Sequence, residues 1–153
     1  MILGKNGKLI VENHAPGVRV LRFIHPDLRD QAYDAGDIER CRLFMDIKTS
    51  ALGYISKREV LIVNMGLIEY FPTVLYSILL KVREILTEHL GGVILCGANA
   101  HTREILDLFK ASRLFAVVKT EEEALELGAH YSGHLLPLPN APLPHQFPEL
   151  STR

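Results

Sequence analysis

The sequence predicts an α/β domain with a mixed, mostly parallel sheet, an N-terminal hairpin and about four helices. Two observations carry this prediction. The runs "EVLIVNMG" and "VILCG" are short and apolar at almost every position, which is typical of strands covered on both faces. Each run is followed by a longer segment whose apolar residues recur at helical spacing. Strands that alternate with helices need crossover connections, and these give a parallel sheet.

The N-terminal part of the chain predicts a hairpin and one helix. The hairpin is expected from about Leu9 to Phe23, around the turn at Ala15-Pro16-Gly17, where proline and glycine suit the two central turn positions. An irregular segment follows over residues 25–36. One helix is then predicted from Asp37 to Thr49, since the following residues fall at helical spacing: Ile38, Cys41, Phe44, Met45 and Lys48.

The middle of the chain predicts the centre of the sheet and its longest helix. Residues 59–66 form the best candidate for the central strand. The stretch "EYFPTVLYSILLKVREILTEHLGG", residues 69–92, holds an amphipathic helix that Gly91-Gly92 end. Its main apolar stripe comprises Val74, Leu75, Ile78, Leu79, Val82, Ile85, Leu86 and Leu90.

The C-terminal part predicts a second covered strand at residues 93–97 and a short one at residues 116–118. Asn99 is expected to cap a helix that buries three apolar residues, and Thr120 with Glu123 forms a capping box for a short helix over residues 120–127. The domain is therefore expected to span residues 1–128, with a proline-rich, extended tail over residues 129–153. The three residues expected to be buried are Ile105, Leu108 and Phe109.

Length and charge restrict the classes of protein. The chain has 153 residues, the usual size of one domain, with a formal charge of −1 and no block of like charge, so we expect no nucleic-acid partner. The longest apolar run, Val74 to Leu80, stops at Lys81, so no membrane span is expected and the sequence indicates a soluble cytoplasmic protein. Cys41 and Cys96 lack the spacing of a disulfide framework or a zinc site.

The sequence offers little catalytic chemistry. No glycine-rich phosphate loop and no GxSxG elbow follows a strand, so we expect no cofactor and no enzymatic activity. His130 and His134 are four residues apart, but the nearby Gly128 and Gly133 argue against a helix there, and we interpret them as a solvated pair rather than a metal site. His25 is either a site residue or, as the residues favour, a loop histidine without a role.

Aromatic and aliphatic side chains suggest a contact surface. Tyr70 and Phe71, before Pro72, either form a docking surface or cover the end of the sheet. Tyr76 and Leu80 lie outside the main apolar stripe of the long helix, so they are predicted to form an exposed apolar strip of the kind that makes contacts.

Residues from about 18 to 127 resemble the STAS domain, the domain of sulphate transporters and anti-sigma-factor antagonists. The resemblance rests on the stretches "EVLIVNMGLIEYFPTVLYSILLKVREIL", "GGVILCGANAHTREILDLFKASRLF" and "KTEEEAL". It implies a STAS-like fold and binding to a protein partner: a kinase, an anti-sigma factor or a scaffold. In antagonist members, a serine or threonine at the start of the long helix is phosphorylated, which switches that binding.

The position that matches this phosphoacceptor is Thr73. The family's usual Asp-Ser-Ser-Gly signature is absent, with Phe71 or Pro72 in the aspartate position and Val74 where glycine is common. A phosphate on Thr73 would meet free amides at the positive end of the helix. Without the signature, the residues favour capping or packing as the sole role of Thr73, and Ser77 is a poorer candidate.

The leading hypothesis is thus a non-enzymatic protein-interaction module that docks through two loops at the carboxyl edge of the sheet. The alternative is a small-anion sensor or an enzyme that uses the same edge, with His101, Arg103 and His25. A third hypothesis is a homodimer built on Tyr76 and Leu80 or on the proline-rich tail. The candidate partner-binding residues are Tyr70, Phe71, Pro72, Thr73, Tyr76, Leu80, Asn99, His101 and Arg103.

Overall fold

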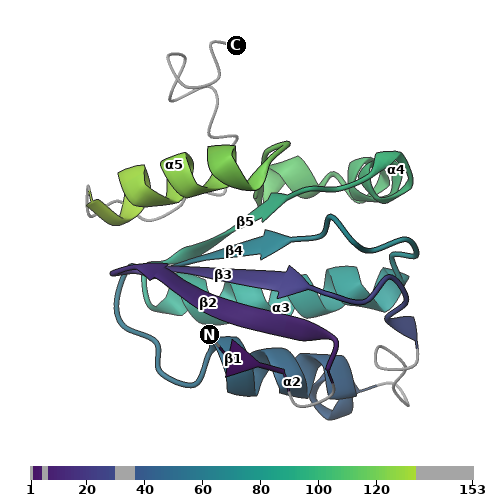
Figure 1. The fold of residues 1–153 in the computed structure, drawn as a ribbon, viewed down its shortest axis with the longest axis horizontal. Coiled ribbons are helices and arrows are strands. Elements are labelled where there is room, and N and C mark those ends of the chain that lie inside the picture. The colour runs from purple at the N-terminus through teal and green to yellow at the C-terminus, as the bar shows by residue number, and fades with distance from the viewer. Residues whose placement is uncertain (1, 5–6, 30–36, 134–153) are drawn as a thin grey trace.

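The computed structural model describes residues 2–4, 7–29 and 37–133. These residues form a six-stranded sheet with helices on both faces (Figure 1). The elements are β1 (Ile2–Leu3), β2 (Leu9–Ala15), β3 (Val18–Phe23), a 3₁₀ turn (Ile38–Arg40), α2 (Arg42–Ala51), β4 (Val60–Asn64), α3 (Thr73–Glu88), β5 (Gly92–Cys96), α4 (Ala100–Leu108), a second 3₁₀ turn (Ala111–Arg113), β6 (Ala116–Val117) and α5 (Glu121–Gly133).

The sheet is mixed and mostly parallel, as predicted. Its strands lie in sequence order, β1 to β6. The pairs β1–β2 and β2–β3 are antiparallel, whereas β3, β4, β5 and β6 run parallel to one another. The predicted hairpin is confirmed, with Gly17 at a φ of 82° in its turn. Strand β1 was not predicted, because two residues that pair Ile2 with Val11 and Leu3 with Ile10 give no periodic signal.

Strands β4 and β5 are covered on both faces, which confirms the prediction for the centre of the sheet. Along β4, Leu61 and Val63 join the larger core, while Val60 and Ile62 face the smaller one. Two separate apolar layers therefore hold the sheet, and β-branched residues on both faces suit this position.

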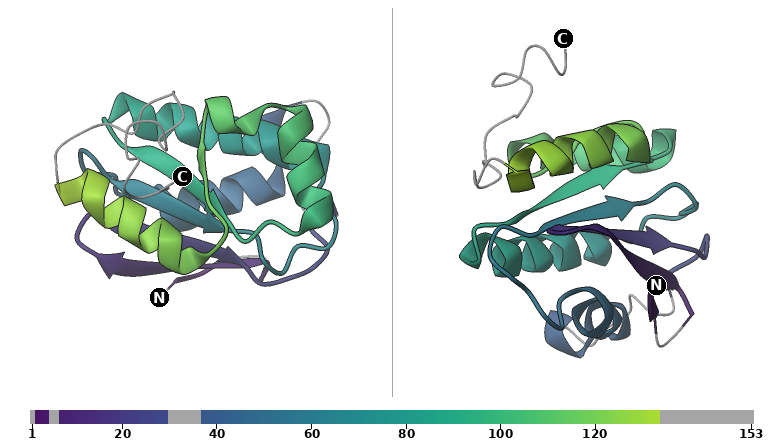
Figure 2. Two further views of the ribbon diagram at one scale, coloured as in Figure 1. Left: turned by 90° about the horizontal axis from the view of Figure 1, so that it is seen from above. Right: turned by 60° about the vertical axis from the view of Figure 1, so that its left-hand side comes forward.

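Two helices cover one face of the sheet and one helix covers the other. The figures show α2 and α3 below the sheet and α5 above it, with α4 at the upper right of Figure 1 (Figures 1 and 2). Helix α5 contacts β3, β4 and β5 and packs Ala124 and Leu127 into the smaller core. Helix α4 joins the larger core through Leu106. Among the described helices, none combines the length and the apolar character that crossing a bilayer requires.

The prediction of one helix from Asp37 to Thr49 was wrong in its first turn. Asp37 caps a 3₁₀ turn, and Cys41 then has an extended backbone, with φ −67° and ψ 129°, before α2 begins. The break turns the helix so that Leu43, Phe44 and Ile47 are buried, whereas Met45 is half exposed.

Helix α4 has the predicted cap but buries a different face. Asn99 accepts a hydrogen bond from the Thr102 amide at 2.7 Å, as expected of an N-cap. The helix buries Thr102 and Leu106, while Leu108 is largely exposed. The predicted burial of Leu108 and Phe109 was wrong, because α4 packs against the core through Thr102 and Leu106 instead.

Helix α5 begins with the predicted capping box. The Glu123 amide donates to Thr120 Oγ1 at 3.1 Å, and the Thr120 amide donates to Glu123 Oε1 at 3.3 Å. The helix continues to Gly133, beyond the predicted end at residue 127, so the argument from Gly128 against a helix was wrong. The predicted tail from residue 134 onward, including His134, lies outside the described residues.

Candidate functional site

The loops that follow β4 and β5 meet at the carboxyl edge of the sheet. The Met65 amide donates to the Cys96 carbonyl at 2.9 Å, and Asn99 Nδ2 donates to the Ile68 carbonyl at 3.0 Å. Asn99 thus caps α4 with its side-chain oxygen and binds the neighbouring loop with its nitrogen. The parallel strand order places both loops here, as the sequence predicts.

Glycine allows these two loops to touch. Gly97 has a φ of 80°, and a Cβ atom added to it would lie 2.7 Å from Asn64 Oδ1 and 3.3 Å from Gly66 Cα. Asn64 Oδ1 in turn accepts a hydrogen bond from the Gly66 amide at 2.8 Å. At this point the loops have no room for even a methyl group, so they form one continuous surface.

A third segment, residues 24–29, lies against the first loop. The Pro26 carbonyl accepts hydrogen bonds from the amides of Glu69 at 2.9 Å and Tyr70 at 3.3 Å, and Asp27 forms a parallel bridge with Tyr70. The sequence singled out only His25 from this segment. The ring of His25 accepts a hydrogen bond from the Asp27 amide at 3.1 Å, which gives this histidine a local structural role.

Tyr70 is an exposed aromatic side chain held in place by two charged neighbours. It is 52% exposed, and the Arg29 guanidinium lies 4.5 Å from the centre of its ring. Arg29 is itself fixed by Asp27, with Nε and Nη2 at 2.9 and 2.7 Å from the carboxylate oxygens. Hydrogen bonds from Arg29 hold the pKa of the Asp27 carboxyl well below its usual range.

Phe71 and Pro72 continue the chain into α3. Phe71 is buried and packs in the larger core, so it covers the end of the sheet. Of the two roles that the sequence left open, Phe71 has the one of covering the end of the sheet, whereas Tyr70 is exposed and remains a candidate contact residue. Pro72 is half-buried and is the N-cap residue of α3, with a ψ of 137°.

Thr73 is the first residue of α3 and is exposed. Because Pro72 occupies the N-cap position, the interpretation of Thr73 as a capping residue was wrong. Its hydroxyl makes no hydrogen bond to any residue that the structure describes. The side chain is thus a free hydroxyl beside the first-turn amides of a helix of 16 residues.

The predicted exposed strip of Tyr76 and Leu80 was wrong. Tyr76 is only 7% exposed, and its ring stacks on Phe109 at 4.6 Å and meets Phe115 edge-on at 6.0 Å. Leu80 is half-buried against the larger core. Helix α4 and the turn after it cover this flank of α3, which the spacing of apolar residues on α3 alone does not reveal.

His101 and Arg103 lie in the first turns of α4 and are exposed. Together with Tyr70 and Thr73, they are candidate site residues that reach solvent at the carboxyl edge. Leu67, in the loop after β4, is 59% exposed at the same edge and was not predicted. Its exposure depends on how the loop folds back onto Asn99, and no pattern in the sequence records this.

Comparison with known proteins shows which fold this chain has. No protein-family model matches the sequence, and no curated protein matches it either. An anti-sigma-factor antagonist (STAS) domain protein from Planctomyces limnophilus matches the structure with a TM-score of 0.57 at 16% identity, over 79% of this chain and 97% of that one. The anti-sigma factor antagonist SpoIIAA, in its unphosphorylated form, matches with a TM-score of 0.53 at 18% identity, over 77% of this chain and 93% of that one.

The chain has the fold of a STAS domain. The resemblance seen in the sequence is thereby confirmed at the level of the fold. Both known structures are matched over almost their whole length, so the carboxyl edge belongs to a complete STAS fold.

A polar cluster in this STAS fold ties α5 to the sheet. Arg22 on β3 binds both carboxylate oxygens of Glu121, at 2.8 and 2.6 Å, and reaches Glu12 at 2.7 Å. Asn64 Nδ2 also donates to Glu121 at 2.8 Å. Hydrogen bonds from Arg22 lower the pKa of the Glu121 carboxyl. No local pattern predicts this pair, because 99 positions separate its members.

The residues that the structure describes offer neither a reactive thiol at Cys96 nor a cluster of metal ligands. Cys96 lies beneath α5, and burial raises the pKa of its thiol to about 12, so it is not a thiolate near neutral pH. Within the described residues, no three His, Cys, Asp or Glu side chains cluster as a metal site would require. His130 lies on α5, and its proposed partner His134 lies outside the described residues.

Proposed function

We propose that this chain is a protein-interaction module of the anti-sigma-factor-antagonist kind. It docks a protein partner, such as a kinase, an anti-sigma factor or a scaffold, through the carboxyl edge of its sheet. The docking surface is formed by exposed side chains from the two contacting loops and the first turns of α3 and α4: Leu67, Tyr70, Thr73, His101 and Arg103.

The observation that carries this proposal is the exposed, immobilised ring of Tyr70. Its main chain is bonded to Pro26, and Arg29 lies over one side of its ring. A large amphipathic side chain that is already ordered loses little entropy on binding, which is why tyrosine is common at the energetic centres of interfaces. Leu67 adds apolar area to this surface, and His101 and Arg103 give it a polar rim.

Phosphorylation of Thr73 is proposed as the switch. Thr73 is exposed, and its hydroxyl makes no hydrogen bond within the described part of the chain, so a kinase can reach it without breaking a bond found there. A phosphate would be favoured at the positive end of α3 and would bring nearly two negative charges onto the docking surface. This charge would oppose the burial of Tyr70 and Leu67 against a partner.

The alternative, a small-anion sensor or an enzyme at the same edge, has less support. The close contact at Gly97 and Asn64 fills the space between the two loops at that point. His25, one of the three residues on which the alternative relies, already accepts the Asp27 amide. His101 and Arg103 remain, but both are exposed rather than enclosed.

The test is affinity capture from the native cell, with the full chain as bait and quantitative mass spectrometry of what it retains. Tyr70→Ala should reduce recovery of the specific partner at least tenfold. Tyr54→Ala is the matched control, because Tyr54 is an exposed tyrosine at the other end of the molecule. Equal recovery with all three baits, or recovery of a small molecule without any protein, would overturn the proposal.

The switch is tested separately by two substitutions of similar size. Thr73→Glu should weaken capture of the same partner, whereas Thr73→Gln should leave it nearly unchanged, because only glutamate supplies negative charge. Equal capture by both variants, with Tyr70→Ala still defective, would remove the switch and leave the docking surface standing.

A further inference from the structure

A chain of hydrogen bonds connects α5 to the loop that carries Leu67. Glu121, the first residue of α5, accepts hydrogen bonds from Arg22 on β3 and, at 2.8 Å, from Nδ2 of Asn64 at the end of β4. The Oδ1 atom of Asn64 accepts the Gly66 amide, also at 2.8 Å. One asparagine side chain therefore binds both a helix on one face of the sheet and a turn at the carboxyl edge.

The turn that presents Leu67 is short. The Ile68 amide donates to the Met65 carbonyl at 3.1 Å, so Gly66 and Leu67 are the two central residues of the turn. Its ends are bonded to β5 and to the loop after β5, whereas its centre is bonded by the side chain of Asn64. Loss of the Asn64 bond would release the centre of the turn, including Leu67, while the ends stay attached.

Two glycines make room for the Asn64 oxygen. A Cβ atom on Gly66 would lie 3.1 Å from Asn64 Oδ1, and a Cβ atom on Gly97 would lie 2.7 Å from it. The oxygen thus occupies the point at which the two loops of the docking surface come together. A change in the orientation of this side chain acts at that point.

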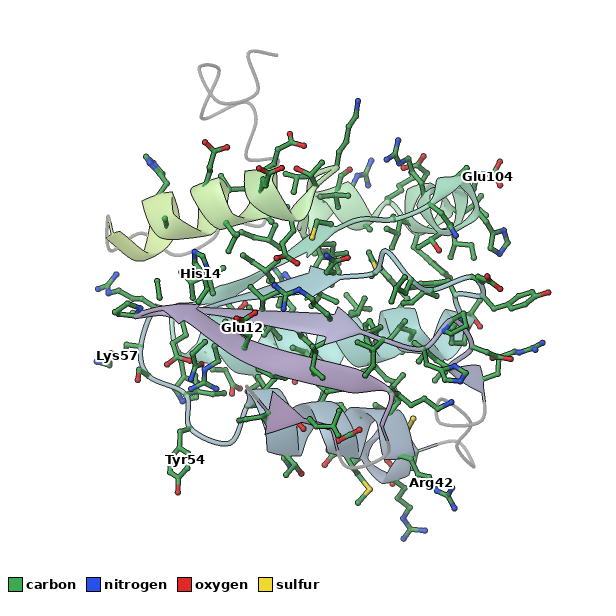
Figure 3. The ribbon with its side chains drawn as sticks, viewed as in Figure 1. Glu12, His14, Arg42, Tyr54, Lys57 and Glu104 are labelled. Carbon is green, nitrogen blue, oxygen red and sulfur yellow. The ribbon has the colours of Figure 1, made fainter. Side chains whose placement is uncertain are left out.

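The charge on Glu121 decides which way the Asn64 amide faces. A carboxylate only accepts hydrogen bonds, so Glu121 must meet the amino group of Asn64, and Oδ1 is left facing the Gly66 amide, which only donates. Arg22 holds the carboxylate in place, because it binds both oxygens of Glu121, at 2.8 and 2.6 Å. Arg22 is itself bound by Glu12 of β2 at 2.7 Å (Figure 3).

We propose that Asn64 is a positioning residue of the docking surface and that Glu121 sets its orientation from α5. With Glu121 bound to Arg22, Asn64 holds the turn at Gly66, and Leu67 is ordered before a partner arrives, which lowers the entropic cost of docking. When the bond to Glu121 is lost, the Asn64 amide turns over and the Gly66 amide loses its acceptor. The start of α5 thereby regulates the order of an interface residue.

The effect on a partner rests on the proposed docking function, whereas the order of the turn is a property of this chain alone. The two can therefore be measured separately.

Two substitutions of nearly equal size test the orientation of Asn64. In Glu121→Gln the new amide has one acceptor, which Arg22 takes, and it turns its amino group toward Asn64. The Asn64 amide must then present its oxygen to α5 and its amino group to Gly66, so the bond to Gly66 is lost. In Asn64→Asp both oxygens accept, but one carboxylate then lies beside another.

The double variant, Asn64→Asp with Glu121→Gln, should restore the turn. Its aspartate can accept both the Gly66 amide and the amino group of the glutamine, so all donors again meet acceptors. Recovery in the double variant would show that the two side chains act through each other and not through separate losses of stability.

The test is nitrogen-15 NMR relaxation of the full chain. The backbone order parameter of Leu67 should be about 0.85 in the wild type, fall below about 0.6 in each single variant and return to about 0.85 in the double variant. The amide proton resonance of Gly66 should shift to lower frequency in the single variants and shift back in the double variant. Glu122→Gln, which removes the same charge at the exposed next position, is the control and should behave like the wild type.

Three results would overturn the positioning role: an unchanged order parameter at Leu67 in the single variants, no recovery in the double variant, or a decrease shared equally by the amides of β4 and β5. The last result would mean that the substitutions only lower global stability.

Affinity capture with the same baits tests the consequence for docking. Each single variant should recover about fivefold less of the partner than the wild type, and the double variant about as much as the wild type. Normal capture by a single variant with a mobile turn would overturn the regulation of docking. Normal capture by Tyr70→Ala as well would remove the proposed docking function, while the NMR result would still decide the role of Asn64.

Discussion

Tyr76 of α3 stacks on Phe109, the residue that ends α4, with ring centroids 4.6 Å apart and ring planes 8° apart. Phe115 meets the same tyrosine edge-on, at 6.0 Å. Offset and edge-on pairs of this kind add about 0.5–1.5 kcal/mol beyond the area they bury. The contact joins α3, which begins at Thr73, to the C-terminal end of α4.

Tyr76→Phe should stabilise the protein or leave its stability unchanged. The Tyr76 hydroxyl is buried without a hydrogen-bond partner among the described residues, and burial raises its pKa. Removing an unsatisfied polar group while keeping the ring relieves a cost of about 1 kcal/mol. Urea unfolding measures the change, and Tyr54→Phe at an exposed site should change stability by less than about 0.5 kcal/mol. A loss of more than about 1 kcal/mol in Tyr76→Phe would mean that the hydroxyl has a partner.

Glu121→Gln should destabilise the protein at neutral pH by about 1–2 kcal/mol, because it removes the charge that two Arg22 nitrogens and Asn64 bind. The lowered pKa of Glu121 means that its contribution is present above the ordinary glutamate pKa of about 4.3. That contribution is lost as the pH falls through the lowered pKa of the folded state. The stability difference between wild type and variant should therefore shrink in acid.

The matched control for this pH dependence is Glu122→Gln, which removes the same charge one residue along α5 at an exposed position. Urea unfolding of the three proteins at a series of pH values gives the comparison. Only Glu121→Gln should reduce the decrease in unfolding free energy that the wild type shows as the pH falls. Identical pH profiles for the two variants would show that the bond to Arg22 contributes nothing beyond charge at the helix start.

The elements that could be predicted from the sequence are those with local causes. The hairpin follows from Pro16 and Gly17, and both confirmed caps follow from side chains within three residues of the amides they bind. The parallel order follows from alternation of strands and helices, and it brings the loops before Thr73 and after Cys96 to one edge.

The features that were missed depend on partners distant in sequence. Whether Tyr76 is exposed is decided by Phe109, and which face of α4 is buried is decided by the core against which Leu106 packs. The segment that orders Tyr70 lies more than 40 positions before it, so only the folded chain shows Arg29 over the ring. The sequence thus predicted that the two loops meet at one edge, but it could not separate the exposed candidate residues from the buried ones.

Thr73→Ala should change stability by less than about 0.5 kcal/mol, because the exposed hydroxyl caps nothing and Pro72 is the N-cap residue. Asn99→Ala should cost about 1–2 kcal/mol, because it removes both the cap on Thr102 and the bond to the Ile68 carbonyl. Thermal or urea unfolding distinguishes the two variants. A cost for Thr73→Ala as large as that for Asn99→Ala would restore a structural role for the threonine.

Two glycine substitutions should have opposite signs. A Cβ atom on Gly91 would lie 2.0 Å from the Glu59 carbonyl oxygen, which is backbone and which also accepts the Gly92 amide at 3.1 Å. Gly91→Ala must therefore displace the start of β5 and should cost about 1–3 kcal/mol or more.

In α5, a Cβ atom on Gly128 would lie 3.5 Å from Val60 Cγ1, an ordinary contact, and alanine is the better helix former. Gly128→Ala should thus stabilise the protein by about 0.5–1 kcal/mol in urea unfolding. A destabilised Gly128→Ala would mean that α5 packs closer to β4 than the structure has it, and a neutral Gly91→Ala would mean that the junction before β5 can yield.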